Sequence, residues 1–480
     1  MSFTFFVPET ILSVGIIILL ITGLVKRDGQ NLQHLIAFSI FSVALFVHVF
    51  HWQVYNEPLN IFNGMLRSDS FSAYLKILID TAGLLTVLMT WRNNAQARLS
   101  EYYALIVTVG LGAHLLTMSI NFVSVFISLE MISISSYALT NFSFSKAGAE
   151  GSLKYFLFGS TASAFMLYGF TFLYGLTGTL DFSSTDFAKA LMNNSSMLFL
   201  LAGCMSLAGL FFKMAAAPLH PWAPDVYEAA PMPIVAFFSV VPKLAGVAVV
   251  TRFLLALNLF GQASHDWQFV TCFVAMLTLT VGNFSALWQQ RPKRLMAYSS
   301  IAQSGFLLVG IAAFVPSGVN FMLFYASIFL VVNYLVFFYL QYFESMGFDT
   351  IESFAGSGKE FAVPMIFLLI GMIALTGLPP TAGFTAKLLV FSSAWEAYQL
   401  SGKQILLWLV VFGLINTVVA LFYYLKIPFY SFIKKGSNRV KTGTQTFEIL
   451  LGASLVLIIL MLFFRPDLLM RWINKINFVL

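Results

Sequence analysis

Cysteine is nearly absent from this sequence, which contains only two in 480 residues. Cys204 and Cys272 stand alone in apolar runs. This pattern excludes a disulfide scaffold and a cysteine-ligated metal site, and we interpret both as small buried residues. The GxGxxG and GxxxxGK signatures of nucleotide sites are missing too, as is the CxxCxxC of an iron–sulfur protein. The sequence therefore predicts no cofactor and no metal in this chain.

Charge is scarce as well, because charged residues make up only 10% of the chain and hydrophobic residues 59%. With a mean hydropathy of +0.86, the composition lies outside the range of soluble domains and indicates an all-α polytopic membrane protein. A formal net charge of +6 in a soluble protein could point to nucleic acid. Here we attribute it to the loops between membrane spans and expect no nucleic-acid partner.

Hydropathy windows of about 19 residues divide the chain into about fourteen predicted spans. The first is followed, not preceded, by basic residues, so we interpret it as a membrane helix and not as a cleaved signal peptide. Residues 361–398 exceed the roughly 20 residues of a straight span, and we predict one helix broken at residues 378–381. The predicted spans are 6–24, 34–52, 70–91, 102–119, 122–142, 153–176, 197–219, 233–257, 267–288, 299–315, 319–343, 361–398, 405–428 and 447–464.

Basic residues gather in the loops that follow odd-numbered spans, which places those loops in the cytoplasm or matrix and both termini outside. These loops hold Lys26 with Arg27, Arg92 with Arg98, Lys146, Arg291 with Lys293 and Arg294, and Lys434 with Lys435, Arg439 and Lys441. The other loops offer little beyond Arg67, Lys189 and Lys403. The C-terminal tail is the exception, with Arg465, Arg471 and Lys475.

Two spans each combine a lysine with proline breaks. Lys213 precedes Pro218 and Pro221, and Lys387 follows Pro379 and Pro380. A lysine at mid-bilayer costs about 2.5 to 3.5 kcal/mol, so it is rarely kept without a task or a partner.

A proline also frees backbone carbonyls, because it has no N–H to donate. Pro218 should release the carbonyl of Met214, and the second pair of prolines should release those of Leu375 and Thr376. Lipid cannot satisfy such groups, so we expect both breaks to line an internal cavity.

The two breaks occupy corresponding places in a duplicated pattern. We predict three N-terminal helices in 1–101, one five-helix repeat in 102–257, a second in 267–428, and a C-terminal helix and tail in 447–480, together forming a single membrane domain of residues 1–480. Each break then falls in the fourth helix of its repeat. An odd number of helices per repeat inverts the second copy, which is typical of transporter folds.

Few other ionisable residues lie inside the predicted spans. Those that we single out are Asp80, His114, Glu130, Lys154, His220 and Lys243. Desolvation disfavours a charged lysine, so a buried one can gain and lose a proton. Two charges about 10 Å apart interact by roughly 1.7 kcal/mol at an effective dielectric of 20, enough for one protonation to bias the next. Static ion pairs that fix helix packing are the structural alternative. We interpret Asp80 and His114 as structural, and Lys154 equally well as an interfacial residue.

Several motifs together resemble one family. SLEMISISSYALTNF (128–142), FFKMAAAPLHPW (211–222) and LTGLPPTAGFTAK (375–387) are similar to the antiporter-like subunits of proton-translocating NADH-quinone oxidoreductase, respiratory complex I. PDVYEAAPMP (224–233), SLKYF and YGLTGTLDF (174–182) resemble subunit N of that complex in particular. The similarity extends over nearly the whole chain.

This resemblance implies a mechanism and a set of partners. Glu130 would form a switchable ion pair with Lys213, Lys243 would relay protons to a central axis, and Lys387 would pass them to the opposite side. Lys154 and His220 would support the path. Gln303 departs from the family, in which histidine often follows SSIA, so it would act as a hydrogen-bonding link or require water. FMN, iron–sulfur clusters and quinone would belong to other subunits, and the partners would be other membrane-arm subunits and, indirectly, the peripheral redox arm.

Three alternatives remain at this point. One is a subunit of a multisubunit cation/proton antiporter, which shares the broken helices. A stand-alone secondary transporter is another, although the breaks offer no arginine clamp or carboxylate cluster for a substrate. A membrane scaffold is the third and conflicts with the repeated buried charges. We expect a bacterial inner membrane, with a mitochondrial inner or thylakoid membrane as the alternative.

Overall fold

The computed structural model describes residues 4–25, 30–52, 55, 57–92, 98–192, 197–258, 266–436 and 446–476. Within these residues the chain is almost entirely helical, and the only sheet is a two-stranded hairpin. The chain divides into two compact units, Met1–Val270 with Ile476–Leu480, and Thr271–Lys475. The division falls close to residue 267, where the second repeat was predicted to begin.

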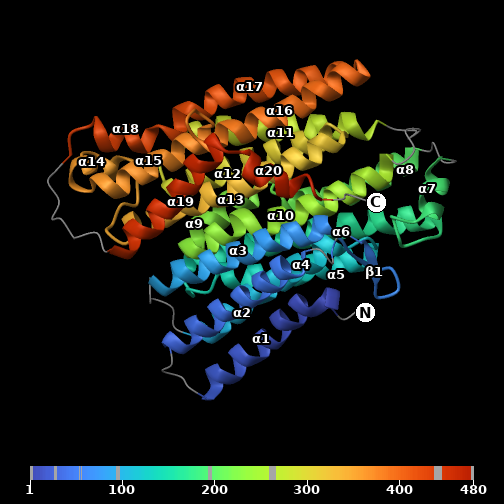
Figure 1. Cartoon of the computed structure of the whole chain (residues 1–480), viewed down its shortest axis with the longest axis horizontal. Helices are drawn as coiled ribbons and strands as arrows, with labels where there is room; N and C mark the ends of the chain where they lie inside the picture. Colours follow the sequence, from blue (N-terminus) through green and yellow to red (C-terminus); the bar gives the residue numbers. More distant parts are fainter. Residues whose placement is uncertain are drawn as a thin grey trace. The chain divides into compact units, whose positions relative to one another are not determined.

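The first unit consists mainly of long apolar helices. Its elements are η1(Thr4–Phe6), α1(Val7–Val25), α2(Gln30–Phe50), β1(Leu59–Ile61), β2(Leu66–Ser68), α3(Ser70–Arg92), α4(Leu99–Met118), α5(Phe122–Thr140), α6(Lys146–Thr177), α7(Thr185–Met192), α8(Met197–Lys213), α9(Trp222–Ala229) and α10(Met232–Asn258). Helix α1 packs on α2 and α4, α2 packs on α3, and α6 runs along α8 and α9 (Figure 1). The antiparallel hairpin pairs Leu59 with Ser68 and Ile61 with Leu66.

Helix α10 forms the interior of this unit, because it is apolar all round and its membrane-spanning window is completely buried. It packs against both α3 and α4. A helix without a polar face has no preferred solvent side, so it is stable at the centre of a bundle. Pro242 lies inside this helix, directly before Lys243.

The second unit has the same character. Its elements are α11(Trp267–Leu287), which begins just before the boundary, α12(Pro292–Ala312), α13(Pro316–Glu344), η3(Glu352–Phe354), α14(Ser357–Glu360), α15(Ala362–Thr376), α16(Ala382–Ser401), α17(Gln404–Tyr424), α18(Lys426–Phe432), α19(Thr446–Phe464) and α20(Asp467–Ile473). Helix α13 is central and contacts α12, α15 and α16, while α19 covers α15 and α16 (Figure 1).

The predicted all-α membrane fold is confirmed. Twelve of the described helices are long and apolar enough to cross a membrane, and α8 and α15 are shorter apolar helices. Every predicted span corresponds to a helix or to a broken helix. The chain is interrupted between α8 and α9 and again between α15 and α16, as the prolines predicted, and each interruption contains a cis Xaa–Pro bond. The inverted relation of the two repeats stays a prediction.

One prediction is wrong. Cys272 is buried, but Cys204 is exposed. It follows Met197 and Leu201 along one face of α8, and both of these are exposed as well. This face would contact lipid, and because lipid and protein core are equally apolar, the sequence around Cys204 does not distinguish them.

Some of the basic loop residues used to predict the orientation lie outside the described residues. They are Lys26, Arg27, Arg439, Lys441 and the side chain of Arg92.

Candidate functional site

The first break is held together by aromatic side chains. Helix α8 ends at Lys213, and the carbonyl of Phe212 accepts hydrogen bonds from the backbone N–H of Ala215 (2.9 Å) and from Nε1 of Trp222 (3.3 Å). Trp222 opens α9 and stacks on Tyr155 of α6, with ring centroids 4.3 Å apart. The tryptophan of the PLHPW turn therefore supplies a donor that the helix itself no longer provides.

Lys213 is 4% exposed, at the last position of α8. Its ammonium lies 5.7 Å from the ring centroids of both Tyr155 and Phe212, within the range of a cation–π interaction. Among the described residues the ammonium has no hydrogen-bond partner. The direct contacts of this ammonium are therefore aromatic faces, which is a weak arrangement for a permanent charge.

Glu130, half-buried on α5, has its own partner in this structure. Its Oε1 accepts a hydrogen bond from the hydroxyl of Ser163 on α6, at 2.5 Å. The carboxylate attracts Lys213 electrostatically without direct contact. The two predicted partners are therefore close enough to interact electrostatically, while the carboxylate is bonded to Ser163. Nothing in the sequence pointed to Ser163.

Lys154 connects α6 to the segment beyond the first break. Its ammonium lies 2.9 Å from Glu150 and 3.0 Å from Asp225 of α9. His220 lies half-buried in the turn, beside the backbone of Pro218. Both predicted supporting residues therefore contact the broken segment itself, and Lys154 acts through Asp225, a residue of the PDVYEA motif.

Lys243 lies on α10 and is 1% exposed. The preceding Pro242 has no N–H, so the helical hydrogen bond to the carbonyl four residues earlier is missing at this level. A lysine next to a proline in a buried membrane helix repeats, without a chain break, the combination found at Lys213 and Lys387.

At the second break, the released carbonyls and the lysine bind one another. Nζ of Lys387 donates to the carbonyl of Thr376 at 2.8 Å and to that of Leu375 at 3.0 Å. These are the two carbonyls that the prolines were predicted to free. The ammonium also lies 4.3 Å from the ring centroid of Phe306. Gly377 ends α15 with a left-handed φ of 84° and lies against the Lys387 side chain.

Gln303 extends this site into a hydrogen-bonded network. Its amide nitrogen donates to Oη of Tyr424 (3.0 Å) and to the carbonyl of Leu375 (3.4 Å), and its amide oxygen accepts from Tyr325. Tyr424 in turn is hydrogen-bonded to Ser299 at 2.5 Å. A small cavity, with about 10 Å³ open to the centre of a water molecule, is lined by Gln303, Tyr325 and Lys387. That is room for roughly one water.

Sequence reasoning missed one pair of buried charges in the first unit and recognised only Asp80 and His114 of a larger buried group. Nη2 of Arg252, on α10, lies 2.7 Å from both carboxylate oxygens of Asp69, and its Nε donates to the carbonyl of Thr117. The larger group consists of Glu9, His48, Lys76, Asp80 and His114, all completely buried. A signal for it was present in the sequence, because each of four successive predicted spans contains at least one of these ionisable residues.

Comparisons with known proteins agree with this geometry. A family model described as NADH:quinone oxidoreductase/Mrp antiporter, TM, matches residues 119–419. A relative from Chlorobium chlorochromatii, named NADH-quinone oxidoreductase subunit N, is 32% identical over 97% of this chain and 93% of its own length.

Two solved structures are similar throughout. A chain of respiratory complex I from Thermus thermophilus is 26% identical with a TM-score of 0.81, covering 98% of this chain and 100% of that one. A chain of the archaeal membrane-bound sulfane sulfur reductase is also 26% identical, with a TM-score of 0.87 over 98% of this chain and 96% of its own.

Proposed function

The chain belongs to the NADH:quinone oxidoreductase/Mrp antiporter transmembrane family, and we propose that it is the subunit N of an NADH-quinone oxidoreductase that moves protons through its buried Glu and Lys residues. The observation that carries this proposal is the state of Lys213, a buried ammonium without a hydrogen-bond partner among the described residues, at the end of a broken helix. Such a group exchanges a proton at low cost, because nothing holds its charge permanently.

In the first unit, Glu130 would act as the switch. While the Glu130 carboxylate is bonded to Ser163, the positive charge of Lys213 is only weakly compensated, so the lysine tends to release its proton. If Glu130 turns from Ser163 to Lys213, the ion pair stabilises the protonated lysine. Lys154 and Asp225 would hold α9 against α6, so that the turn containing His220 keeps its place beside Lys213.

In the second unit, Lys387 would be the terminal proton carrier. Its ammonium is stabilised by two carbonyl dipoles, and Gln303 with one water in the adjoining cavity could hand a proton to it. We assign Lys243, on the buried α10, as the relay from the first unit to a polar central axis. Gln303 cannot titrate, so its role would be to orient the hydroxyls of Tyr325 and Tyr424.

The redox chemistry would lie in other subunits. The chain is a membrane subunit, and we propose that it has no catalytic activity of its own, with FMN, iron–sulfur clusters and quinone bound elsewhere in the complex. Its expected neighbours are other antiporter-like subunits of the membrane arm, in a bacterial inner membrane. The second candidate, a subunit of a cation/proton antiporter complex, is favoured by the shared broken helices and by the family model, which covers both kinds of protein. Copurification with NADH-oxidising subunits would separate the two.

The Lys213→Ala variant tests the function. In membranes with the fully assembled complex, checked on a native gel, we expect proton pumping to collapse relative to NADH–quinone electron transfer. Lys189→Ala is the matched control, because Lys189 is an exposed lysine of α7, and its pumping should equal that of the wild type. Normal pumping by assembled Lys213→Ala complex would make this lysine structural and remove the basis of the proposal.

A further inference from the structure

The buried charges at the start of the chain gather at one end of four packed helices. Glu9 is the third residue of α1, and His48 is the third from the end of α2. Lys76 lies in the second turn of α3 and Asp80 near the middle of that helix, and His114 is near the end of α4. Since successive helices alternate in direction, these positions share the side of the membrane on which the N-terminus lies. All five side chains are 0% exposed.

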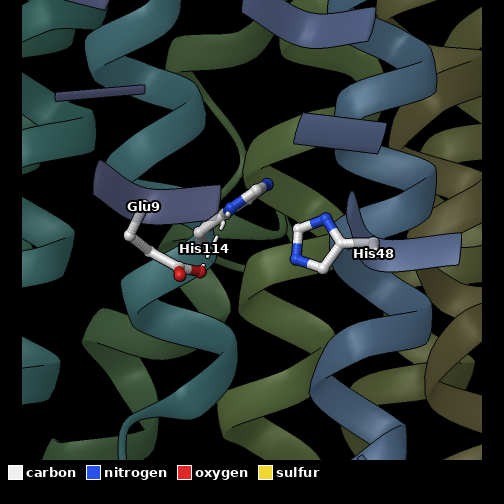
Figure 2. A group of neighbouring side chains, drawn as sticks. All are labelled: Glu9, His48 and His114. Carbon is white, nitrogen blue, oxygen red and sulfur yellow. Dashed lines mark ion pairs between the residues drawn. The ribbon is translucent and has the colours of Figure 1, made fainter. Parts of the chain in front are cut away.

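Their contacts form a continuous chain. Lys76 Nζ lies 2.7 Å from Oε1 of Glu9, and His114 Nδ1 lies 3.4 Å from the same oxygen. Nε2 of His114 faces Oδ1 of Asp80 at 3.1 Å, and Nδ1 of His48 is bonded to Oδ2 of Asp80 at 3.0 Å. Figure 2 shows the His114 ring between Glu9 and His48.

The position of His114 decides its protonation. A neutral imidazole has one N–H and one lone pair, so it can satisfy only one acceptor. His114 has a carboxylate oxygen beside each ring nitrogen. Only the imidazolium, which carries an N–H on both nitrogens, presents a positive edge to both. His48 has one carboxylate contact, so its neutral form suffices.

The charge count leads to the same result. Glu9 and Asp80 contribute two negative charges, and Lys76 contributes one positive charge. An uncompensated buried charge is costly, so the group requires one further positive charge. From the elements packed around it, Arg252 of α10 is already committed to Asp69. Tyr55, whose ring centroid lies 6.1 Å from that of His48, contributes no charge as a neutral phenol.

We propose that Glu9, His48, Lys76, Asp80 and His114 form a second proton-binding site, which holds one exchangeable proton on His114. The site is separate from the residues assigned to the transfer path, and it deepens the proposed function by placing a proton-loading group at the N-terminal end of the bundle. When the proton leaves, one ring nitrogen of His114 carries a lone pair, so either Glu9 or Asp80 loses its donor, and release is coupled to a movement of that carboxylate.

A divalent cation is the competing occupant, because Glu9, His48 and His114 offer donor atoms within 4.8 Å of one another. The positive ammonium of Lys76 lies 2.7 Å from the Glu9 carboxylate and would repel a divalent cation bound there. A divalent ion would also turn the deficit of one positive charge into an excess, whereas one proton brings the group to neutrality.

Infrared difference spectroscopy of the intact complex with isotope-labelled histidine tests the site. The spectrum of wild type minus His114→Gln should contain one imidazolium signal that titrates with pH. His34→Gln is the matched control. His34 is a buried histidine of α2, the helix that carries His48, but it is bonded to Tyr103 and not to the group. The spectrum of the His34→Gln complex should retain the imidazolium signal. A difference spectrum without an imidazolium band would overturn the proposal.

A second variant tests the charge argument without touching the ring. In Asp80→Asn, Glu9 and Lys76 balance each other, so His114 should become neutral and its imidazolium signal should be lost. Persistence of the signal in Asp80→Asn would contradict the proposal. Elemental analysis of the purified complex provides a further check. One equivalent of a divalent metal that is present in the wild type and lost in His114→Gln would also contradict the proposal. Lys213→Ala should leave the imidazolium signal intact, so the two proposals fail separately.

Discussion

The lysines at the two breaks are buried to the same extent but are held by different partners. Lys387 donates to two carbonyls, whereas Lys213 faces aromatic rings. Removing a hydrogen-bond partner from a buried group costs about 1 to 3 kcal/mol for each group left unpaired. Removing Lys213 leaves no such group, so the stabilities of the two variants should differ even if both stop pumping.

We therefore expect Lys387→Met to lower the unfolding temperature of the assembled complex clearly more than Lys213→Met does. Differential scanning fluorimetry would measure this, with Lys403→Met, at the exposed end of α16, as control. Equal destabilisation by the Lys213 and Lys387 variants would show that the carbonyls find other donors, and that Lys387 is not needed to close the break.

Gln303 permits a second test at the residue level. Gln303→Leu keeps the volume but removes the links to Tyr325, Tyr424 and the carbonyl of Leu375. We expect a several-fold lower pumping rate and a loss of about 1 to 3 kcal/mol in stability. Gln303→His can still donate and accept hydrogen bonds, so it should retain most of the pumping in the same proteoliposome assay. Full activity of Gln303→Leu would exclude this network from the proton path.

At the scale of helices, the end of α15 depends on a glycine for two reasons. Gly377 has a φ of 84°, and a Cβ built there would come within 2.7 Å of Cδ of Lys387. Gly402, which ends α16, has a φ of 68° and nothing within 4 Å of such a Cβ. Alanine at either position should cost about 1 to 2 kcal/mol for its left-handed conformation.

Comparing the two alanine variants isolates the contact with Lys387. Gly402→Ala should lose stability only. Gly377→Ala should lose stability and, because the lysine is displaced from its carbonyls, pumping as well. Thermal unfolding and pumping of both variants would check this, and equal pumping by the two would show that the ammonium keeps its position despite the added methyl group.

The sequence predicts the helices and their breaks well, because hydropathy and proline act locally. It does not predict which faces meet. The helices are apolar all round, so Cys204 could not be assigned to lipid or core, and Ser163 could not be recognised as the partner of Glu130. Asp225 and Glu9 were missed for a similar reason, since each is paired with a lysine on a different helix.

For the whole molecule, the prediction concerns the sides of the membrane. Seven membrane crossings separate Lys146 from Lys403 if each broken helix counts as one: α6, α8 with α9, α10, α11, α12, α13, and α15 with α16. An odd number places the two lysines on opposite sides, and the basic loops assign Lys146 to the inside. Both are exposed at helix ends.

With Cys204 and Cys272 replaced by alanine, the Lys403→Cys variant should react with a membrane-impermeant maleimide in intact cells. Lys146→Cys should react only after permeabilisation. The opposite result for both would reverse the orientation and keep the number of crossings. Labelling of both from one side would mean that a broken helix returns to the side from which it entered. In that case Lys213 or Lys387 could not lie on a path that crosses the membrane through its own helix, and the role of that break as half of a proton channel would be lost.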